Sequence, residues 1–158
     1  MKRWNRVRVA LVVLVVGTLC GLWSAVALGQ SCSVSASGVS FAGYDPFALS
    51  DVLASGQIEV RCSEGTAYEV RLSPGEHGSL LQRKLKHLSL SWTLSYQLFT
   101  DAARTVIWGD GSGSSGWVSG VGQGTSAPQV HVIYGRLPAR QNVHVGDYQD
   151  QIVVTVNY

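Results

Sequence analysis

Four histidines are the side chains of this chain best suited to acid–base catalysis or metal binding, and they are scattered along the sequence. We expect His77 in a loop, and His87, His131 and His144 solvated, next to or on the polar face of strands. A Ser/His/Asp triad can be assembled from almost any such sequence, and no GxSxG motif frames a serine. The sequence therefore predicts that the protein is not an enzyme.

Two glycine-rich motifs could hold a ligand, but neither has the pattern that ligand binding requires. Residues 120–124 read GVGQG, without the third glycine spacing or the strand–helix context of a dinucleotide site. Residues 110–113 read DGSG, without the series of carboxylates that calcium needs. We therefore expect no cofactor and no bound metal.

The N-terminus has the order of a secretory signal peptide. A basic stretch precedes an uncharged, mostly apolar run over residues 9–28, and small residues stand at 27 and 29. We expect residues 1–29 to be the signal peptide and residues 30–158 the secreted domain. The alternative is an uncleaved membrane anchor, because about twenty uncharged residues can span a bilayer. A lipoprotein signal at Cys20 is disfavoured by the large Leu19 before it.

Removal of the signal peptide leaves Cys32 and Cys62 as the remaining cysteines. In an oxidising compartment two such cysteines form a disulfide by default, although a pair of buried thiols is the alternative. The bond would close a loop of about thirty residues and contribute ~3–4 kcal/mol in the chain-entropy model. A metal site would need more ligands than these two.

The charge of the secreted part differs in sign from that of the whole chain. The segment before Gln30 carries four of the twelve basic residues and none of the ten acidic ones, so residues 30–158 have a net charge of −2. No basic surface is implied, and nucleic acid is not an expected partner. We interpret the basic run at residues 83–87 as a solvated loop.

Alternating apolar and polar residues predict strands along the whole domain. The longest alternation covers residues 88–98, and the last covers residues 151–158, where Ile152, Val154, Val156 and Tyr158 share one face. Residues 57–62 and 67–72 read as a hairpin, and residues 73–86 as a loop. Residues 109–124 hold seven glycines and four serines, so we expect a flexible segment that Trp117 and Val118 pin at one point.

Seven or eight short strands with turns between them, and no convincing amphipathic helix, predict an antiparallel β-sandwich of Greek-key or immunoglobulin-like type. A closed barrel is the alternative. The sequence contains no sign of a domain boundary within residues 30–158 and no internal repeat.

Short motifs spread along the secreted part resemble the spore coat protein U domain family, which includes spore coat proteins and subunits of archaic chaperone–usher pili. The similarity covers Cys32 to Tyr158. Its motifs are Cys32 with Val34, then FAGYDP at 41–46, GQIEVRC at 56–62, YEVRLSPG at 68–75, LSYQLFTD at 94–101, TVIWGDG at 105–111, YGRLP at 134–138 and the closing residues 146–158.

The resemblance implies an incomplete immunoglobulin-like sandwich that lacks its last strand. In such pilins a periplasmic chaperone lends a strand to the open groove, and a neighbouring subunit later replaces it; this is β-augmentation. The implied partners are the chaperone, an outer-membrane usher and other pilus subunits, and the implied location is the periplasm and then the cell surface. Ile152, Val154, Val156 and Tyr158 would then line or border the groove.

One departure separates this sequence from the family pattern. Pilins of this type carry a donor segment of ten or more alternating residues before the first cysteine, whereas cleavage before Gln30 leaves two residues here. We therefore expect a subunit that accepts a strand without donating one, at a pilus end or outside a polymer. The alternative function is a self-contained secreted coat or matrix-binding, adhesive domain. If the protein binds a ligand at a tip, the glycine- and serine-rich loop with Trp108 and Trp117 is the candidate contact, and a disordered connection is the alternative for that loop.

Overall fold

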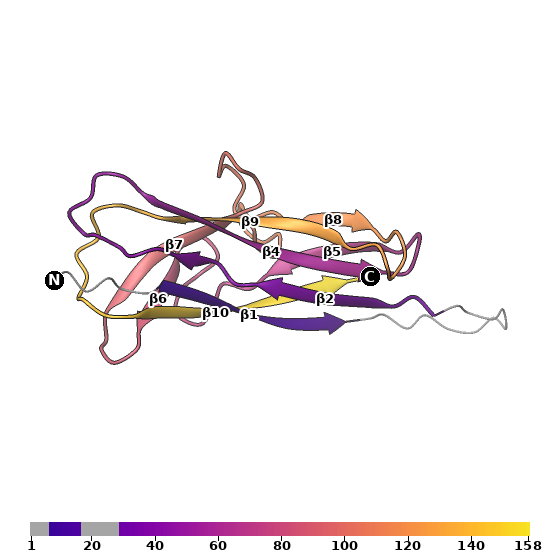
Figure 1. The fold of residues 1–158 in the computed structure, drawn as a ribbon, viewed down its shortest axis with the longest axis horizontal. Helices are drawn as coiled ribbons and strands as arrows, with labels where there is room; N and C mark the ends of the chain where they lie inside the picture. Colours follow the sequence, from indigo (N-terminus) through magenta and orange to yellow (C-terminus); the bar gives the residue numbers. More distant parts are fainter. Residues whose placement is uncertain (1–6, 17–28) are drawn as a thin grey trace.

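The computed structural model of the protein describes residues 7–16 and 29–158, and these residues form ten β-strands (Figure 1). In chain order they are β1 (Val7–Val16), β2 (Cys32–Ser37), β3 (Ser40–Phe41), β4 (Val52–Cys62), β5 (Ala67–Leu72), β6 (Arg83–His87), β7 (Thr93–Phe99), β8 (Val118–Val121), β9 (Gln129–Leu137) and β10 (Tyr148–Asn157). In this part of the chain no helix is long and apolar enough to cross a membrane. The all-β prediction is confirmed.

The strands form two layers that share strand β7. One layer has the order β2-β4-β9-β7, and the other contains β6, β10, β5 and β8 together with β1 and β3. Strand β7 pairs with β6 through residues 93–96 and with β9 through residues 97–99. A strand that passes from one sheet to the other makes the corner of a sandwich. The predicted antiparallel sandwich is therefore confirmed, with one parallel pair, β1 with β10.

The core lies between the layers and is built from the alternating positions of the strands. In β10, Ile152, Val154 and Val156 are fully buried, whereas Gln151 is exposed, so the predicted alternation of the last strand is confirmed. Among the described residues the largest buried side chain is Trp108, whose indole Nε1 donates to the carbonyl of Val70 at 2.9 Å. A buried indole needs this partner because an unpaired buried donor is destabilising.

The disulfide joins Cys32 and Cys62, as predicted. The two residues stand directly opposite each other on β2 and β4, thirty positions apart in sequence. The bond therefore ties the first strand of the secreted part to the long strand β4, which pairs with β9 along its other edge.

The longest predicted strand begins later than the alternation indicates. Strand β7 starts at Thr93, and Leu88, Leu90 and Trp92 lie in the preceding turn with 56%, 41% and 43% of their surface exposed. The turn is closed by a hydrogen bond from the amide of His87 to the carbonyl of Trp92. The prediction was wrong for residues 88–92 because alternation alone does not show which neighbour covers a side chain.

The predicted hairpin of residues 57–62 and 67–72 is also wrong. Strand β4 pairs with β2 and β9 in one sheet, whereas β5 pairs with β10 and β8 in the other. The turn between them therefore crosses from layer to layer. The ten strands outnumber the seven or eight expected because β6 and β8 lie in segments predicted as loops and β1 lies in the segment predicted as the signal peptide.

The basic run at residues 83–87 is a strand, not a solvated loop. Arg83 and His87 point inward in β6 and are buried, at 0% and 7% exposure, while Lys84 and Lys86 point outward. The alternating burial of β6 therefore places two polar side chains where a sequence reading expects apolar ones.

Candidate functional site

The two edges of β10 are completed in different ways. On one edge its start pairs with β6 at Tyr148 and Gln149, and its end pairs with β5 from Val154 to Asn157. The gap between these two pairings is bridged by the segment after β5. Ser73 donates its amide to the carbonyl of Val153 and accepts the amide of Val153 on its hydroxyl, at 3.0 and 2.9 Å. This edge of β10 is therefore covered by its own domain.

The other edge of β10 pairs along its whole length with β1 (Figure 1). The register runs in parallel from Val7 opposite Tyr148 to Val16 opposite Asn157. On its far side β1 pairs with β3 in antiparallel fashion at residues 7 and 8. Strand β1 thus fills a slot between β10 and β3.

Strand β1 belongs to the segment predicted as the signal peptide. The domain boundary at residue 30 stays a prediction, because residues 1–6 and 17–28, with most of the expected cleavage region, lie outside the described residues. Cleavage there would remove β1 and expose the backbone N–H and C=O groups of β10 along ten registered positions. Such an unpaired edge is a template for another strand.

Three of the four predicted acceptor residues, Ile152, Val154 and Val156, lie as a row on β10 beside this slot. Leu11 of β1 stands opposite Ile152 in the register, is half-buried and packs against the core. Val154 and Val156 follow at the next inward positions, both fully buried. Tyr158 is half-buried just beyond the end of β10. The role of these four residues as an acceptor groove remains a prediction.

A buried carboxylate interrupts the apolar row of β10, and sequence reasoning missed it. Asp150 is 2% exposed, accepts a hydrogen bond from the hydroxyl of Tyr96 at 2.6 Å and accepts the amides of Glu76 and Gln151 at 2.9 Å. Burial raises the pKa of Tyr96, and the negative charge of Asp150 and the hydrogen bond add to this rise. The contact with Glu76 therefore attaches the segment after β5, which covers one edge of β10, to the strand itself.

A buried arginine completes the same network. Arg83 donates to Gln97 Oε1 at 2.6 Å and to the backbone carbonyls of Ser73 and Trp108 at 2.8 Å each. Burial lowers the pKa of Arg83 to about 10, while Tyr96 and Asp150 oppose that shift. Arg83 therefore holds the segment after β5 in place beside β10.

One group of side chains has the composition of a metal site. Glu76, His77 and Asp150 each place one possible ligand atom within 4.8 Å of the others. However, both oxygens of Asp150 already accept hydrogen bonds from the protein. The hydrogen bonds of Asp150 within the domain therefore account for the position of its carboxylate in this group.

The histidines occupy four different environments. His87 is buried, in contrast to the expectation, and His144 is exposed as expected. His131 is half-buried, and its Nε2 lies 2.9 Å from the hydroxyl of Tyr68, a contact that joins β9 to β5 across the layers. Burial lowers the pKa of His131 and raises that of Tyr68. His77 is exposed beside Glu76.

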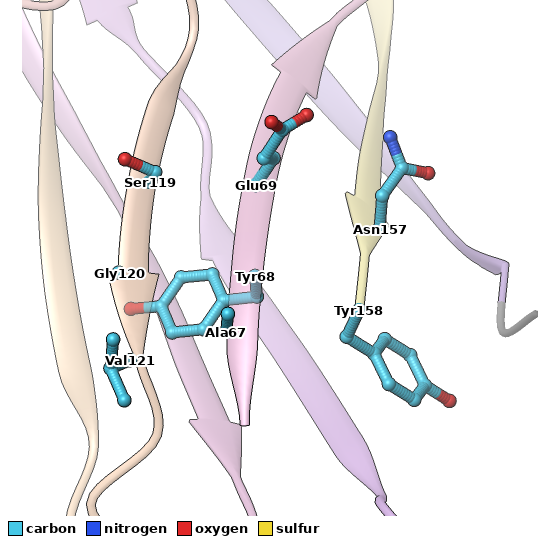
Figure 2. A pocket seen from close by; sticks show the side chains of 8 residues that line it. All are labelled: Ala67, Tyr68, Glu69, Ser119, Gly120, Val121, Asn157 and Tyr158. Carbon is cyan, nitrogen blue, oxygen red and sulfur yellow. The ribbon is translucent and has the colours of Figure 1, made fainter. Parts of the chain in front are cut away.

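A surface hollow of about 550 Å³ lies between β8, β5 and the end of β10 (Figure 2). It is lined by Ala67, Tyr68, Glu69, Ser119, Gly120, Val121, Asn157 and Tyr158. Gly120 is required there because a Cβ at this position would collide with the Tyr68 ring. Tyr158 therefore lines this hollow in addition to lying at the end of the β10 row.

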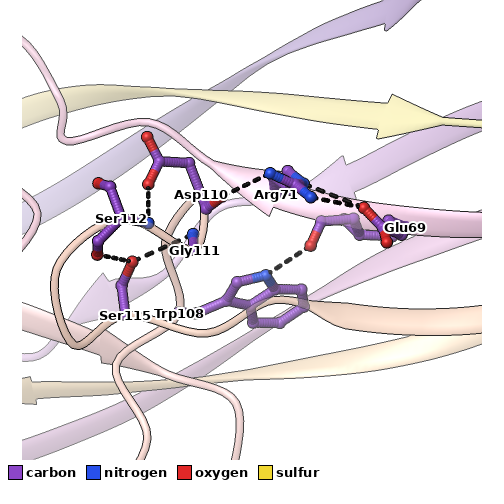
Figure 3. A network of polar contacts seen from close by, with 8 residues as sticks. Glu69, Arg71, Trp108, Asp110, Gly111, Ser112 and Ser115 are labelled. Carbon is purple, nitrogen blue, oxygen red and sulfur yellow. Dashed lines mark hydrogen bonds and ion pairs between the residues drawn. The ribbon is translucent and has the colours of Figure 1, made fainter.

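The glycine- and serine-rich segment is folded against β5 (Figure 3). Arg71 donates to the carbonyl of Asp110 at 2.6 Å and to Glu69 Oε2 at 2.7 Å, and its guanidinium lies 4.6 Å from the Trp117 ring centre. The predicted pinning by Trp117 is thus found. Trp108, proposed from sequence as a ligand contact, is fully buried and cannot meet a ligand.

Three loops meet at the end of the sandwich where β4, β7 and β10 begin, at the left in Figure 1. The hydroxyl of Tyr44 donates to the carbonyl of Pro138 at 3.0 Å and accepts the amide of Gln141 at 2.7 Å. The Gln141 side chain bonds both backbone groups of Ser95. These contacts join loops 42–51 and 138–147 to β7.

This end of the sandwich, which we call the apolar end, carries six exposed large apolar side chains on loops 42–51, 88–92 and 138–147. They are Phe47, Leu49, Leu88, Leu90, Trp92 and Val145. Loop tips are commonly polar, so exposed apolar side chains on three loops of one end make this end a candidate contact surface. The apolar residues Leu88, Leu90 and Trp92 are visible in the sequence, but their alternation predicts a strand there instead of an exposed loop.

Comparisons with known proteins agree with the motifs and the fold. A family model, Spore Coat Protein U domain, matches residues 21–155. Protein U of Myxococcus xanthus is 26% identical over 146 residues, which cover 83% of this chain and 79% of that protein.

A solved structure resembles the fold at low sequence identity. It is the CsuC–CsuE chaperone–tip adhesion subunit pre-assembly complex from the archaic chaperone–usher Csu pili of Acinetobacter baumannii, with a TM-score of 0.61 and 24% identity. The match covers 82% of this chain and 40% of that chain. At this identity the likeness shows a shared fold.

Proposed function

Because the chain belongs to the Spore Coat Protein U domain family, we propose that it is a structural subunit of an archaic chaperone–usher surface appendage. In this proposal it is secreted, passes through the periplasm, and accepts a strand along the β10 edge that β1 fills. The observation that carries the proposal is the asymmetry of β10. One edge is completed by β6, β5 and Ser73, and the other is completed by residues of the predicted signal peptide.

The accepted strand would bind through its backbone and be selected through alternate side chains. Backbone hydrogen bonds along β10 supply affinity without regard to sequence. Inward side chains of the incoming strand would stand at the register positions of Val9, Leu11, Val13 and Val15, opposite the row from Asp150 to Val156. We therefore propose that the partner is an alternating apolar strand, lent first by a periplasmic chaperone and then, with the help of an usher, by a neighbouring subunit.

The test is the solution behaviour of residues 30–158 produced in an oxidising compartment. We expect aggregation when this fragment is made alone, because the β10 edge and the apolar row are uncovered, and a soluble one-to-one complex when the chaperone is co-expressed. A matched control carries a short turn and then a ten-residue alternating strand fused after Tyr158, which can fold back along the open edge of β10 and should make folding independent of the chaperone. A cooperative, monomeric melt of the unfused fragment alone would contradict the open edge.

The apolar end favours a second candidate function, a self-contained coat or adhesive domain. Its six exposed apolar side chains lie on three loops at one end of the sandwich, and contacts of Tyr44 hold two of these loops, 42–51 and 138–147, together. The two candidates predict different results in the same experiment. A stable monomer that loses surface binding on Leu90→Ser and Trp92→Ser, with unchanged melting, would favour the adhesive domain.

A further inference from the structure

His87 connects two of the loops that form the apolar end. Its ring is buried at the end of β6, and its Nδ1 accepts the amides of Ser89 and Leu90, both at 3.0 Å. Its Nε2 lies 3.3 Å from the carbonyl of Val145 in the loop before β10. One imidazole therefore contacts loop 88–92 with one nitrogen and loop 138–147 with the other.

The three contacts define the protonation state of the ring. Two backbone N–H groups point at Nδ1, so this nitrogen must be the unprotonated acceptor, and Nε2 must carry the hydrogen that is donated to Val145. The neutral Nε2–H tautomer satisfies all three contacts. An imidazolium carries hydrogens on both nitrogens, so a proton on Nδ1 would face two N–H groups and both hydrogen bonds would be lost.

The surroundings of the ring leave little room for it to adjust. Tyr148 of β10 packs edge-on against it with the ring centres 5.0 Å apart, and a Cβ added at Gly146 would collide with Nε2. The amide of Leu88 donates to the carbonyl of Asp147 at 3.0 Å, which joins the same two loops beside the ring. The ring cannot turn away from Ser89 and Leu90 without displacing these neighbours.

In the part of the chain that the structure describes, few titratable or charged groups lie near the ring. His144 lies with its ring centre 6.5 Å away, and Tyr148 donates its hydroxyl to the carbonyl of His144 at 2.8 Å. Lys86 precedes His87 on β6 and points to the other side of the sheet. Asp147 follows Gly146 in the adjoining loop. Within the described residues no carboxylate forms an ion pair with His87 that would compensate a charge on the ring.

We propose that His87 is an acid-released clamp: its neutral ring holds loops 88–92 and 138–147 together, and protonation of Nδ1 frees loop 88–92. The clamp controls the display of Leu90, Trp92 and Val145, which are three of the exposed side chains of the apolar end. It adds a pH response to this surface and does not depend on whether β10 accepts a strand.

The test is amide hydrogen exchange combined with NMR titration of the histidine rings, on the secreted protein in the assembly in which it is purified. We expect the protection of the Ser89 and Leu90 amides, corrected for the intrinsic pH dependence, to fall at least about tenfold from pH 8 to pH 5. This loss should follow the titration of the His87 ring. The amide of Trp108, bonded to the carbonyl of Leu98 in the core, should keep its protection.

Two variants distinguish the clamp from a general effect of acid. His87→Asn keeps an acceptor near the position of Nδ1 that does not titrate, so the two amides should stay protected at both pH values. His77→Gln removes a histidine whose contacts are with Glu76 and Asp150, away from loops 88–92 and 138–147, and should leave the transition unchanged. Unchanged protection of Ser89 and Leu90 while His87 titrates would overturn the proposal. A His87 ring that stays neutral at pH 5, or the same loss of protection in His87→Asn, would also overturn it.

Discussion

Replacement of Arg83 by methionine tests whether a buried cation holds the domain together. The change removes the hydrogen bonds to Ser73, Gln97 and Trp108 while it keeps most of the side-chain volume. Gln97 Oε1 still accepts the amide of Leu98, so two backbone carbonyls lose their arginine partner. An unsatisfied buried acceptor destabilises by about 1–3 kcal/mol. The variant no longer buries a charge, which offsets part of this loss.

We therefore expect Arg83→Met to lower the free energy of unfolding by about 3 kcal/mol, or Tm by roughly 10 °C for a domain of this size. The assay is denaturant or thermal unfolding with the disulfide intact, with every variant in the same assembly state. Lys84→Met is the matched control, because Lys84 is the next residue of β6 and its side chain points outward. We expect the control to stay within about 0.5 kcal/mol of the parent.

The refuting result is an Arg83→Met variant that is as stable as the parent. It would mean that the penalty of burying the guanidinium balances its hydrogen bonds, as occurs for some buried ionic groups. The segment from Ser73 to Glu76 would then be held on β10 by its own contacts with Val153 and Asp150 alone.

Three further predictions follow from the same structure. Joint replacement of Cys32 and Cys62 by alanine should destabilise the domain by about 3–4 kcal/mol, measured by denaturant unfolding against the oxidised parent. Because the pKa of Tyr96 is raised in the folded state, the neutral phenol stabilises the fold below the free tyrosine value near pH 10, and this stabilisation is lost as the pH rises further. Tyr96→Phe should therefore reduce the loss of stability at alkaline pH. An unchanged slope of stability against pH would contradict this prediction. Because burial lowers the pKa of His131, its neutral ring stabilises the fold above the free histidine value near pH 6.5. This stabilisation is lost as the pH falls, so His131→Gln should flatten the acid limb of a Tm–pH curve, and an unchanged acid limb would contradict it.

The sequence predicts the sandwich and its last strand well because local alternation and burial agree there. Ile152, Val154 and Val156 alternate with polar residues and all three are fully buried. In residues 88–92 the same alternation is present but the apolar side chains are exposed. Alternation in the sequence indicates an extended backbone, whereas the burial of each side chain depends on strands that are distant in the chain.

Polar residues inside the core were missed for a related reason. Arg83 and His87 read as part of a basic surface run, and their burial depends on partners at Gln97, Trp108 and Val145, all distant in sequence. The pairing of β5 with β10, in place of β4, likewise joins residues more than eighty positions apart. Single-sequence patterns contain no information on such pairings, so the candidate site was predicted only along β10.

The disulfide also determines how the domain responds to a pulling force. A load applied at residues before Cys32 passes directly through the covalent bond to Cys62 on β4, and β2 cannot be peeled from its neighbour to release length. The loop of about thirty residues between the two cysteines is withheld from extension, which shortens the stretched chain by roughly 100 Å. Under tension the domain would therefore transmit force through the sheet that contains β4 and β9. The residues between Cys32 and Cys62 could extend only after the disulfide is reduced.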